Sequence, residues 1–242
     1  MDKIYQNKIN ADIVLKEPSG GIRFGTDALL LADFANGMRK GSCLDLGTGS
    51  GVIPLLMLAS GCRADFVGLE IQQSYADIAS ENAKANGFSD RFSIKCGNAD
   101  EHRNLFDCGS FDYVITNPPY MRSDCGADNE SNALNIARRE VFGGIESFCK
   151  AASWCLKSGG SFFAVYRPDR LAHIICAMRE NRIEPKRLRA VVASVGAKPS
   201  LILIEGRKDG NEGLIYENDL IIYTDNKHQE QTDEMKRIYE RF

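Results

Sequence analysis

The residues best suited to chemistry in this 242-residue sequence stand in a row, Asn117-Pro118-Pro119-Tyr120. The side-chain oxygen of Asn117 and the carbonyl oxygen of Pro118 could each accept one N–H of a planar amine, while Tyr120 stacks on its ring. Such contacts would direct the lone pair of an exocyclic amine, which is a poor nucleophile because the ring delocalises that pair. A strand-ending turn without a chemical role is an equally good interpretation of these four residues alone.

The segment before this motif, Phe111–Thr116, must position it. The segment is rich in β-branched and aromatic residues and ends at two prolines that cannot donate to a sheet ladder. These features predict a buried strand with Asn117 at its carboxyl end. Ligands bind at that edge of an open α/β sheet, so the motif is expected to face a ligand site.

A glycine turn follows the predicted strand Ser42–Leu46, with Gly47, Gly49 and Gly51 before a predicted helix. Missing Cβ atoms let the backbone approach a ligand, and the helix N-terminus supplies free N–H donors. The pattern Asp-x-Gly-x-Gly-x-Gly, beginning at Asp45, differs from the Gly-x-Gly-x-x-Gly of dinucleotide sites. It predicts a nucleoside ligand without a pyrophosphate and disfavours an NAD enzyme.

Two further polar positions follow the next predicted strands. Glu70 ends the strand that begins at Asp65, and a carboxylate there can accept both hydroxyls of a ribose. After the predicted third strand, either Asn98 or Asp100 could bind the amine of an adenine, and a helix N-cap is the alternative for both. The glycine turn and Glu70 together favour a nucleoside site over a bare turn.

Strand and helix patterns alternate along the chain, which predicts an α/β fold. Near the N-terminus, residues 4–15 and 22–24 are expected to form a hairpin around the turn at 17–21, and Thr26 or Asp27 to cap a helix. This front piece is expected to cover the ligand site or to serve only for packing. Helices are predicted at 71–86, 143–156 and 168–181, and an antiparallel strand pair at 188–195 and 200–206.

Composition excludes several classes of protein. The chain is 43% hydrophobic and 26% charged, with a net charge of −3, as expected of an ordinary soluble globular protein. It has eight cysteines and no Cys-x-x-Cys, which predicts neither a zinc site nor a disulfide framework. No leader and no apolar segment of membrane-spanning length is apparent, so we expect a cytoplasmic protein.

The sequence DLGTGSG, Glu70 and the Asn-Pro-Pro-Tyr motif resemble class I S-adenosylmethionine methyltransferases that act on amino groups. The segment Gly21–Ala32, together with Gly196–Pro199 and Tyr223–Thr224, is similar to the tRNA(Val) adenine N6-methyltransferase family, whose members act on adenine 37 beside the anticodon. The resemblance implies a Rossmann-like α/β fold with a seven-stranded sheet, parallel except for one antiparallel strand, and helices on both faces. It implies one domain with an N-terminal extension (1–40), a catalytic core (41–210) and a C-terminal strand and helix (211–242).

The resemblance also implies a substrate, a cofactor and site residues. The substrate would be tRNA, the cofactor S-adenosyl-L-methionine and its product S-adenosyl-L-homocysteine, with no metal or membrane partner and a monomer or weak homodimer. One departure is Asn98, where many relatives carry aspartate. The implied residues are Asn117, Pro118, Pro119 and Tyr120 for catalysis; Arg23, Thr26, Asp45, Gly47, Gly49, Gly51, Glu70, Ile71, Asn98, Ala99 and Asn117 for the cofactor; and Arg122, Arg138, Arg139 and Lys198 for the substrate.

Alternatives remain for the substrate and its contacts. A release-factor glutamine methyltransferase would hold a carboxamide with the same acceptors, although its usual N-terminal helical domain has little room before Asp45. A cofactor-binding module without catalysis is a third possibility. Residues 121–135 could be a substrate loop or a linker. A basic group could neutralise RNA phosphates or be ordinary solvated charge: Arg179, Arg182, Lys186, Arg187 and Arg189.

Overall fold

The computed structural model describes residues 4–8, 13–18, 25–118 and 144–242. A nine-stranded sheet forms its centre, in the order β10-β8-β9-β7-β6-β3-β4-β5, with β11 also pairing with β8. The prediction of seven strands was wrong, because two-residue strands β10 and β11 extend the sheet beyond β8. The bounds are β3 Ser42–Leu46, β4 Asp65–Glu70, β5 Phe92–Cys96, β6 Phe111–Thr116, β7 Leu156–Tyr166, β8 Ile183–Val192, β9 Pro199–Lys208, β10 Ile215–Tyr216 and β11 Leu220–Ile221.

The sheet is parallel except at β9, which runs antiparallel to both β7 and β8. This confirms the predicted pattern of one antiparallel strand. The register aligns the carboxyl ends of four neighbouring strands, because Leu46 pairs with both Thr116 and Leu69, and Glu70 pairs with Cys96. The residues that directly follow β6, β3, β4 and β5 therefore lie together at one edge of the sheet. This edge is called the carboxyl edge, and the opposite one the amino edge.

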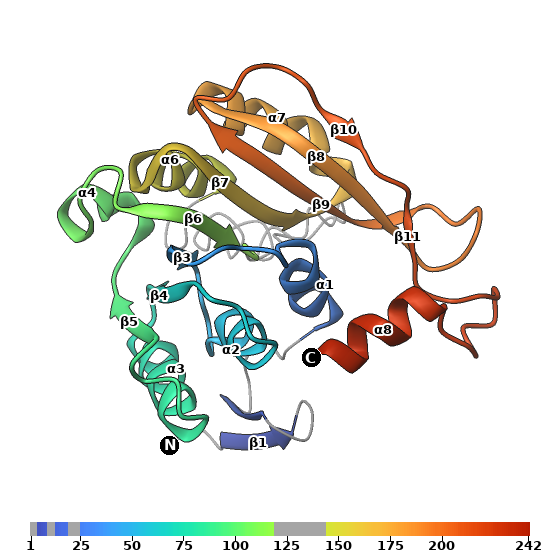
Figure 1. Cartoon of the computed structure of the whole chain (residues 1–242), viewed down its shortest axis with the longest axis horizontal. Coiled ribbons are helices and arrows are strands. Elements are labelled where there is room, and N and C mark those ends of the chain that lie inside the picture. Colours follow the sequence, from blue (N-terminus) through green and yellow to red (C-terminus); the bar gives the residue numbers. More distant parts are fainter. Residues whose placement is uncertain (1–3, 9–12, 19–24, 119–143) are drawn as a thin grey trace, which may run out of the picture.

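Helices cover both faces of the sheet, as predicted (Figure 1). Alternate strand residues belong to two separate cores: Cys43 and Ile115 pack with α1, α2 and α8, whereas Leu44 and Val114 pack with α6 and α7. The sheet is thus apolar on both faces, as buried parallel strands require. The helices are α1 Thr26–Phe34, α2 Val52–Ala59, α3 Gln73–Ala85, α4 His102–Leu105, α6 Ile145–Cys155, α7 Leu171–Glu180 and α8 Asp233–Arg241, with 3-10 turns at Ala99–Glu101 and Pro168–Arg170.

Strand β7 begins at Leu156, directly after α6, where the sequence predicted the end of a helix. Gly159 and Gly160 lie inside this strand at an irregular part of its pairing with β6. A Cβ at Gly160 would lie 2.9 Å from the carbonyl oxygen of Asp112, so only glycine lets the two backbones approach there. The glycine pair marks a strand irregularity and not a helix stop.

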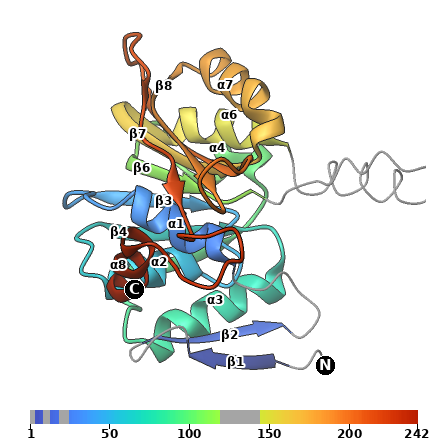
Figure 2. The ribbon, with the colours of Figure 1, turned by 90° about the vertical axis from the view of Figure 1, so that its right-hand side faces the viewer.

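The N-terminal hairpin consists of β1 Ile4–Lys8 and β2 Val14–Pro18. A hairpin was predicted, but its second strand was placed wrongly at residues 22–24. Strand β2 lies along helix α3 (Figure 2), where two asparagine side chains bind its backbone. These long-range contacts, which have no local sequence signature, explain the difference.

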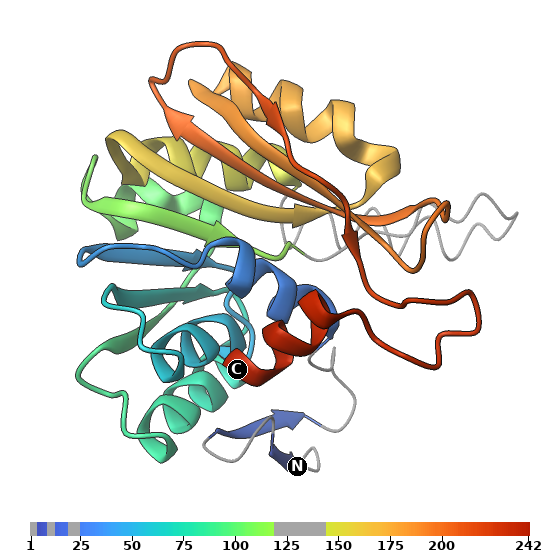
Figure 3. The same cartoon turned by 45° about the vertical axis from the view of Figure 1, so that its right-hand side comes forward.

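The C-terminal helix α8 packs back beside α1 (Figure 3), and Arg241 forms an ion pair with Asp33. Thr232 caps this helix, since its hydroxyl accepts a hydrogen bond from the Met235 N–H at 3.2 Å. None of the helices in the described part of the chain has the length and apolar character that crossing a membrane requires.

Candidate functional site

Four predicted site segments lie side by side at the carboxyl edge. Asn117 follows β6, Gly47 follows β3, Glu70 ends β4 and Asn98 follows β5. The chain runs from β3 through β4 to β5 on one side and returns to β6 on the other, so the order reverses between β3 and β6. Open α/β sheets bind ligands at such a reversal. The structure brings these residues together, and their individual roles stay predictions.

The glycine turn has a left-handed backbone at all three glycines. Gly47, Gly49 and Gly51 have φ values of +72°, +56° and +83°. The N–H groups of Gly47 and Thr48 donate to the Leu69 carbonyl at 2.9 and 3.1 Å, which fixes the turn to β4. A Cβ added at Gly49 would meet nothing within 4 Å. The turn therefore has open space at its centre, where a ligand can approach the backbone.

Glu70 is buried beside this turn, with 6% of its surface exposed. Its Oε2 accepts the Gly49 N–H at 3.0 Å and its Oε1 accepts the Gln72 N–H at 2.9 Å. Burial raises the pKa of Glu70, and the N–H groups of Gln72, Gly49 and Ile71 oppose that rise. A carboxylate can accept about four hydrogen bonds, so Glu70 retains capacity for a ligand hydroxyl.

Asp45 lies on β3 with 1% of its surface exposed. Its Oδ2 accepts a hydrogen bond from the Thr48 hydroxyl at 2.6 Å, whereas its Oδ1 has no partner in the described residues. Burial, with a smaller contribution from the nearby charge of Glu70, raises the pKa of Asp45 to about 7. An unpartnered buried carboxylate oxygen is costly unless a ligand meets it, so the pair of carboxylates fits a ligand with a cationic or N–H-bearing group.

This geometry predicts a pH-dependent affinity for such a ligand. Asp45 is mostly protonated below pH 7 and mostly ionised above it. A cation favours the ionised form, so we expect the Kd for S-adenosylmethionine to rise about tenfold as the pH falls from 8 to 6. Titration calorimetry across this range checks the slope, with Asp45→Asn as the control that should flatten it. The neighbouring titratable groups are Glu70 and the buried thiol of Cys43. Burial raises the pKa of the Cys43 thiol, which therefore keeps its proton across this pH range, so an unchanged slope in Asp45→Asn would assign the effect to Glu70.

Asn117 and Pro118 are placed by β6. Thr116, immediately before them, is fully buried, and its hydroxyl donates to the Leu46 carbonyl of β3 at 2.8 Å. This bond ties the end of β6 to the start of the glycine turn. Asn117 is half-buried and Pro118 is buried. The motif thus begins directly beside Gly47, because Leu46 pairs with Thr116.

Of two predicted cofactor residues, Asn98 has a structural role in the described residues, whereas Thr26 lacks the capping role predicted for it. The Asn98 side chain accepts the Asp100 N–H at 3.0 Å and caps the 3-10 turn that contains buried Ala99, so the capping interpretation holds for Asn98. Thr26 is exposed in the first turn of α1. The predicted cap at Thr26 or Asp27 was wrong, because the N-cap residue is Gly25.

The remaining predicted residues are divided between described and undescribed parts. Lys198 is exposed in the turn between β8 and β9, at the same edge as Asn117. Six predicted residues lie outside the described residues: Arg23, Pro119, Tyr120, Arg122, Arg138 and Arg139.

The basic group near β8 is neutralised within the protein. Its arginines all contact carboxylates: Arg179 with Glu184 and Glu212, Arg182 with Asp209, Arg187 with Glu205 and Glu217, and Arg189 with Glu234. Lys186 donates to the Asn211 carbonyl. Arg179 and Arg182 precede β8, which starts at the amino edge of the sheet, opposite the site. These contacts favour the interpretation of the group as ordinary solvated charge.

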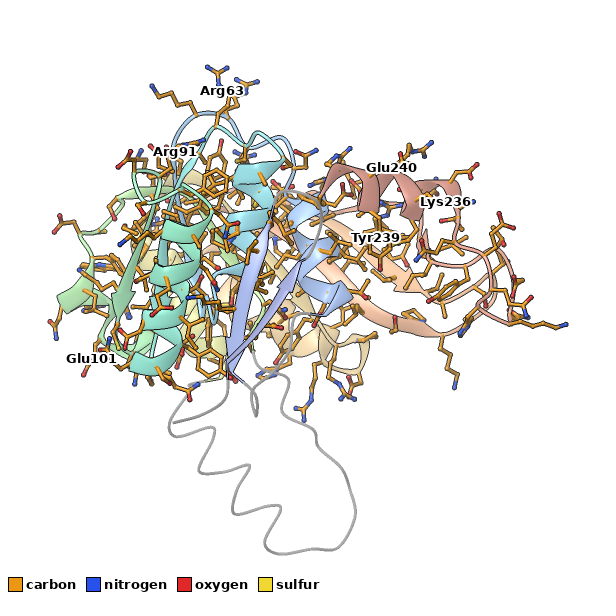
Figure 4. The ribbon with its side chains drawn as sticks, turned by 90° about the horizontal axis from the view of Figure 1, so that it is seen from below. Arg63, Arg91, Glu101, Lys236, Tyr239 and Glu240 are labelled. Carbon is orange, nitrogen blue, oxygen red and sulfur yellow. The ribbon has the colours of Figure 1, made fainter. Side chains whose placement is uncertain are left out.

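A cavity of about 570 Å³ opens at the amino edge, lined in part by Arg39, Asp112, Lys157 and Arg207. Figure 4 shows that the two edges lie at opposite ends of the molecule: Arg63 and Arg91, which precede β4 and β5, are at one end, and Glu101, which follows β5, is toward the other. Asp112 lies five residues before Asn117, about 16 Å along the strand. The cavity is therefore separate from the candidate site.

Sequence reasoning missed two buried polar residues at the turn, Thr48 and Asn82. Thr48 fits because β4 has glycine opposite it, and a Cβ at Gly68 would lie 2.7 Å from its methyl group. Asn82 is fully buried and donates to the Ser50 carbonyl at 2.9 Å. A signal for Asn82 was present, since it is a polar residue within the apolar stripe of the predicted helix.

The chain is similar to known proteins in both sequence and fold. The family model of the methyltransferase small domain matches residues 19–180. A "tRNA1(Val) (adenine(37)-N6)-methyltransferase" from Porphyromonas gingivalis is 32% identical over 192 residues, covering 77% of this chain and 74% of the relative. A "release factor glutamine methyltransferase" from Agrobacterium fabrum is 36% identical over 121 residues, 49% of this chain and 40% of the relative. The crystal structure of a predicted O-methyltransferase from Agrobacterium tumefaciens has a TM-score of 0.73 at 22% identity, covering 89% of this chain and 96% of that one, so it shares the fold.

Proposed function

Because the chain belongs to the methyltransferase small domain family, and is thus an S-adenosylmethionine-dependent methyltransferase, we propose that it methylates N6 of an adenine in tRNA. The proposed target is adenine 37, beside the anticodon, as the name of the Porphyromonas gingivalis relative states for that protein. The observation that carries the proposal is the position of Asn117 and Pro118 beside the glycine turn and Glu70, on three adjacent strands.

The cofactor is assigned to the β3 and β4 ends. S-adenosylmethionine supplies an electrophilic methyl group on a cationic sulfonium when it is bound. Glu70 would accept the ribose hydroxyls, Gly49 would let the backbone approach, and Asp45 would face the cationic part. Two buried carboxylates suit this ligand and would repel a pyrophosphate.

Asn117 and Pro118 are assigned to the target amine. With one N–H held by the Asn117 side-chain oxygen and the other by the Pro118 carbonyl, the lone pair of the amine points away from both acceptors. The target base leaves its RNA stack to reach this position, and Tyr120 stacks on it. No titrating side chain is required, because the methylated nitrogen is acidic and loses its proton to the Pro118 carbonyl or to water.

The RNA backbone is assigned to the carboxyl edge near Lys198. Strand β9, which follows Lys198, is two strand spacings from β6, about 10 Å across the sheet. In the described residues, the Lys198 side chain has no acidic partner, unlike the arginines around β8. Lys198 can therefore contact a phosphate without first breaking an ion pair.

Replacing Lys198 tests this assignment. We expect Lys198→Ala to weaken tRNA binding and to reduce the slope of log K against log salt by about 0.7 to 0.9, the value for one lost phosphate contact. Arg182→Ala is the matched control, because Arg182 is also exposed but is paired with Asp209 at the amino edge. Filter binding at several salt concentrations measures both slopes. Equal changes in the two variants would contradict the assignment.

The function itself is tested with labelled S-adenosylmethionine on four substrates in parallel: unmodified total tRNA, ribosomal RNA, DNA and release factor. Label in tRNA, recovered as N6-methyladenosine, is the expected result. Label in the release factor would replace this proposal with glutamine methylation, the activity in the name of the Agrobacterium fabrum relative that matches 49% of this chain. Bound cofactor without transfer to any of the four would support a binding module.

A further inference from the structure

We infer that Asn82, on helix α3, is a positioning residue that couples the N-terminal hairpin to the glycine turn of the cofactor site. The inference rests on the proposed cofactor site at that turn. Asn82 touches neither the Asn117 motif nor Glu70 in the described contacts, so it acts through the backbone it holds.

The amide of Asn82 makes three hydrogen bonds to backbone groups far apart in the sequence. Its Oδ1 accepts the Lys16 N–H at 2.9 Å, and its Nδ2 donates to the Lys16 carbonyl at 3.0 Å. The same Nδ2 also donates to the Ser50 carbonyl at 2.9 Å. The side chain thus pairs with the backbone of β2 as a neighbouring strand would, and its third hydrogen bond, to Ser50, reaches the glycine turn.

Ser50 is a sensitive point of that turn. It lies between Gly49, whose N–H donates to Glu70, and Gly51, the N-cap residue of helix α2. The bond from Asn82 to the Ser50 carbonyl is buried, so its loss would leave that carbonyl without a protein partner away from water. The turn would then have to shift to satisfy the carbonyl, and the backbone that faces the cofactor would shift with it.

Asn86 provides a natural comparison one helical turn later. Its Oδ1 accepts the Val14 N–H at 2.9 Å and its Nδ2 donates to the Val14 carbonyl at 2.8 Å. Its Nδ2 also donates to the Asn82 carbonyl at 2.8 Å, within the same helix. Asn86 therefore holds β2 as Asn82 does, but none of its side-chain hydrogen bonds in the described residues reaches the glycine turn. The two asparagines separate attachment of the hairpin from support of the turn.

The test compares the two positions in the full chain. We expect Asn82→Ala to raise the Kd for S-adenosylmethionine about tenfold, equivalent to about 1.4 kcal/mol. Asn86→Ala should leave that Kd within about twofold, since it alters β2 without altering the turn. The KM for the cofactor should rise in Asn82→Ala while kcat at saturation is kept. The matched pair Asn82→Leu and Asn86→Leu retains side-chain volume and replaces the alanine pair if a cavity prevents folding.

A second measurement does not depend on the cofactor. Amide hydrogen exchange in the free protein should quicken at Gly49 and Gly51 in Asn82→Leu and stay unchanged there in Asn86→Leu. Equal cofactor Kd values and equal exchange in the two variants would overturn the inference while leaving the proposed function intact. A wild-type chain that binds no S-adenosylmethionine would overturn both.

Discussion

Replacing Asn117 by alanine is expected to lower kcat about 10²- to 10³-fold, the effect typical of removing one preorganised hydrogen-bonding group from an active site. The side-chain oxygen of Asn117 is one of the two acceptors that direct the target amine. The methyl group of alanine cannot accept a hydrogen bond in its place. The Kd for S-adenosylmethionine should change little, because the glycine turn and Glu70 stay in place. Single-turnover methylation and cofactor titration measure the two quantities separately.

A matched control for this prediction is Asn181→Ala. Asn181 follows helix α7 at the amino edge of the sheet, and its amide donates to the Ala177 carbonyl at 2.8 Å. The substitution removes the same amide group as Asn117→Ala does, but far from the site, so kcat should equal that of the wild type. Full activity in Asn117→Ala would show that the amine is held elsewhere.

Replacing Glu70 by alanine should have the converse effect and raise the Kd for S-adenosylmethionine about 10- to 100-fold. Each hydrogen bond to a charged group contributes about 1.5–3 kcal/mol, and about 1.4 kcal/mol corresponds to tenfold in Kd. The substitution also frees the Gly49 N–H from its bond to Oε2, which loosens the turn. At saturating cofactor, kcat should stay within a small factor of the wild-type value.

The control for Glu70 is Asp112→Ala. Asp112 is a carboxylate at the opposite edge, bound to Lys157 at 2.7 Å and to the Ser42 N–H at 3.0 Å. Its loss removes structural contacts of a similar kind, so calorimetry should show a cofactor Kd close to wild type. A drop in kcat without a change in Kd for Glu70→Ala would mean that this carboxylate acts on the substrate.

Local sequence patterns predicted the strands that carry the site. Phe111–Thr116, Ser42–Leu46 and the strand ending at Glu70 all have the predicted bounds, because short apolar segments and the turn residues after them are local signals. Their meeting at one edge followed from the geometry of parallel sheets. The family resemblance also agrees with the comparisons.

Features that depend on contacts between residues distant in the sequence could not be predicted from local sequence patterns. The position of β2 is decided by Asn82 and Asn86, and the division of the expected C-terminal strand into β10 and β11 is decided by their pairing with β8. The arginines around β8 resembled a phosphate site because their carboxylate partners lie up to 45 residues away. The lack of a partner for the Oδ1 atom of Asp45 likewise depends on the folded structure and has no signal in the sequence. The cytoplasmic location, the domain division and the oligomeric state stay predictions.

The most direct measurement of the central claim uses two transcripts of tRNA1(Val), one unmodified and one with adenine 37 replaced by guanine. Each is incubated with the purified protein and S-adenosylmethionine, digested to nucleosides and analysed by mass spectrometry. We predict N6-methyladenosine in the first transcript and none in the second. Equal N6-methyladenosine in both would contradict the assigned position. Its absence from both, with methylglutamine formed in a release factor under the same conditions, would contradict the claim that this chain modifies tRNA.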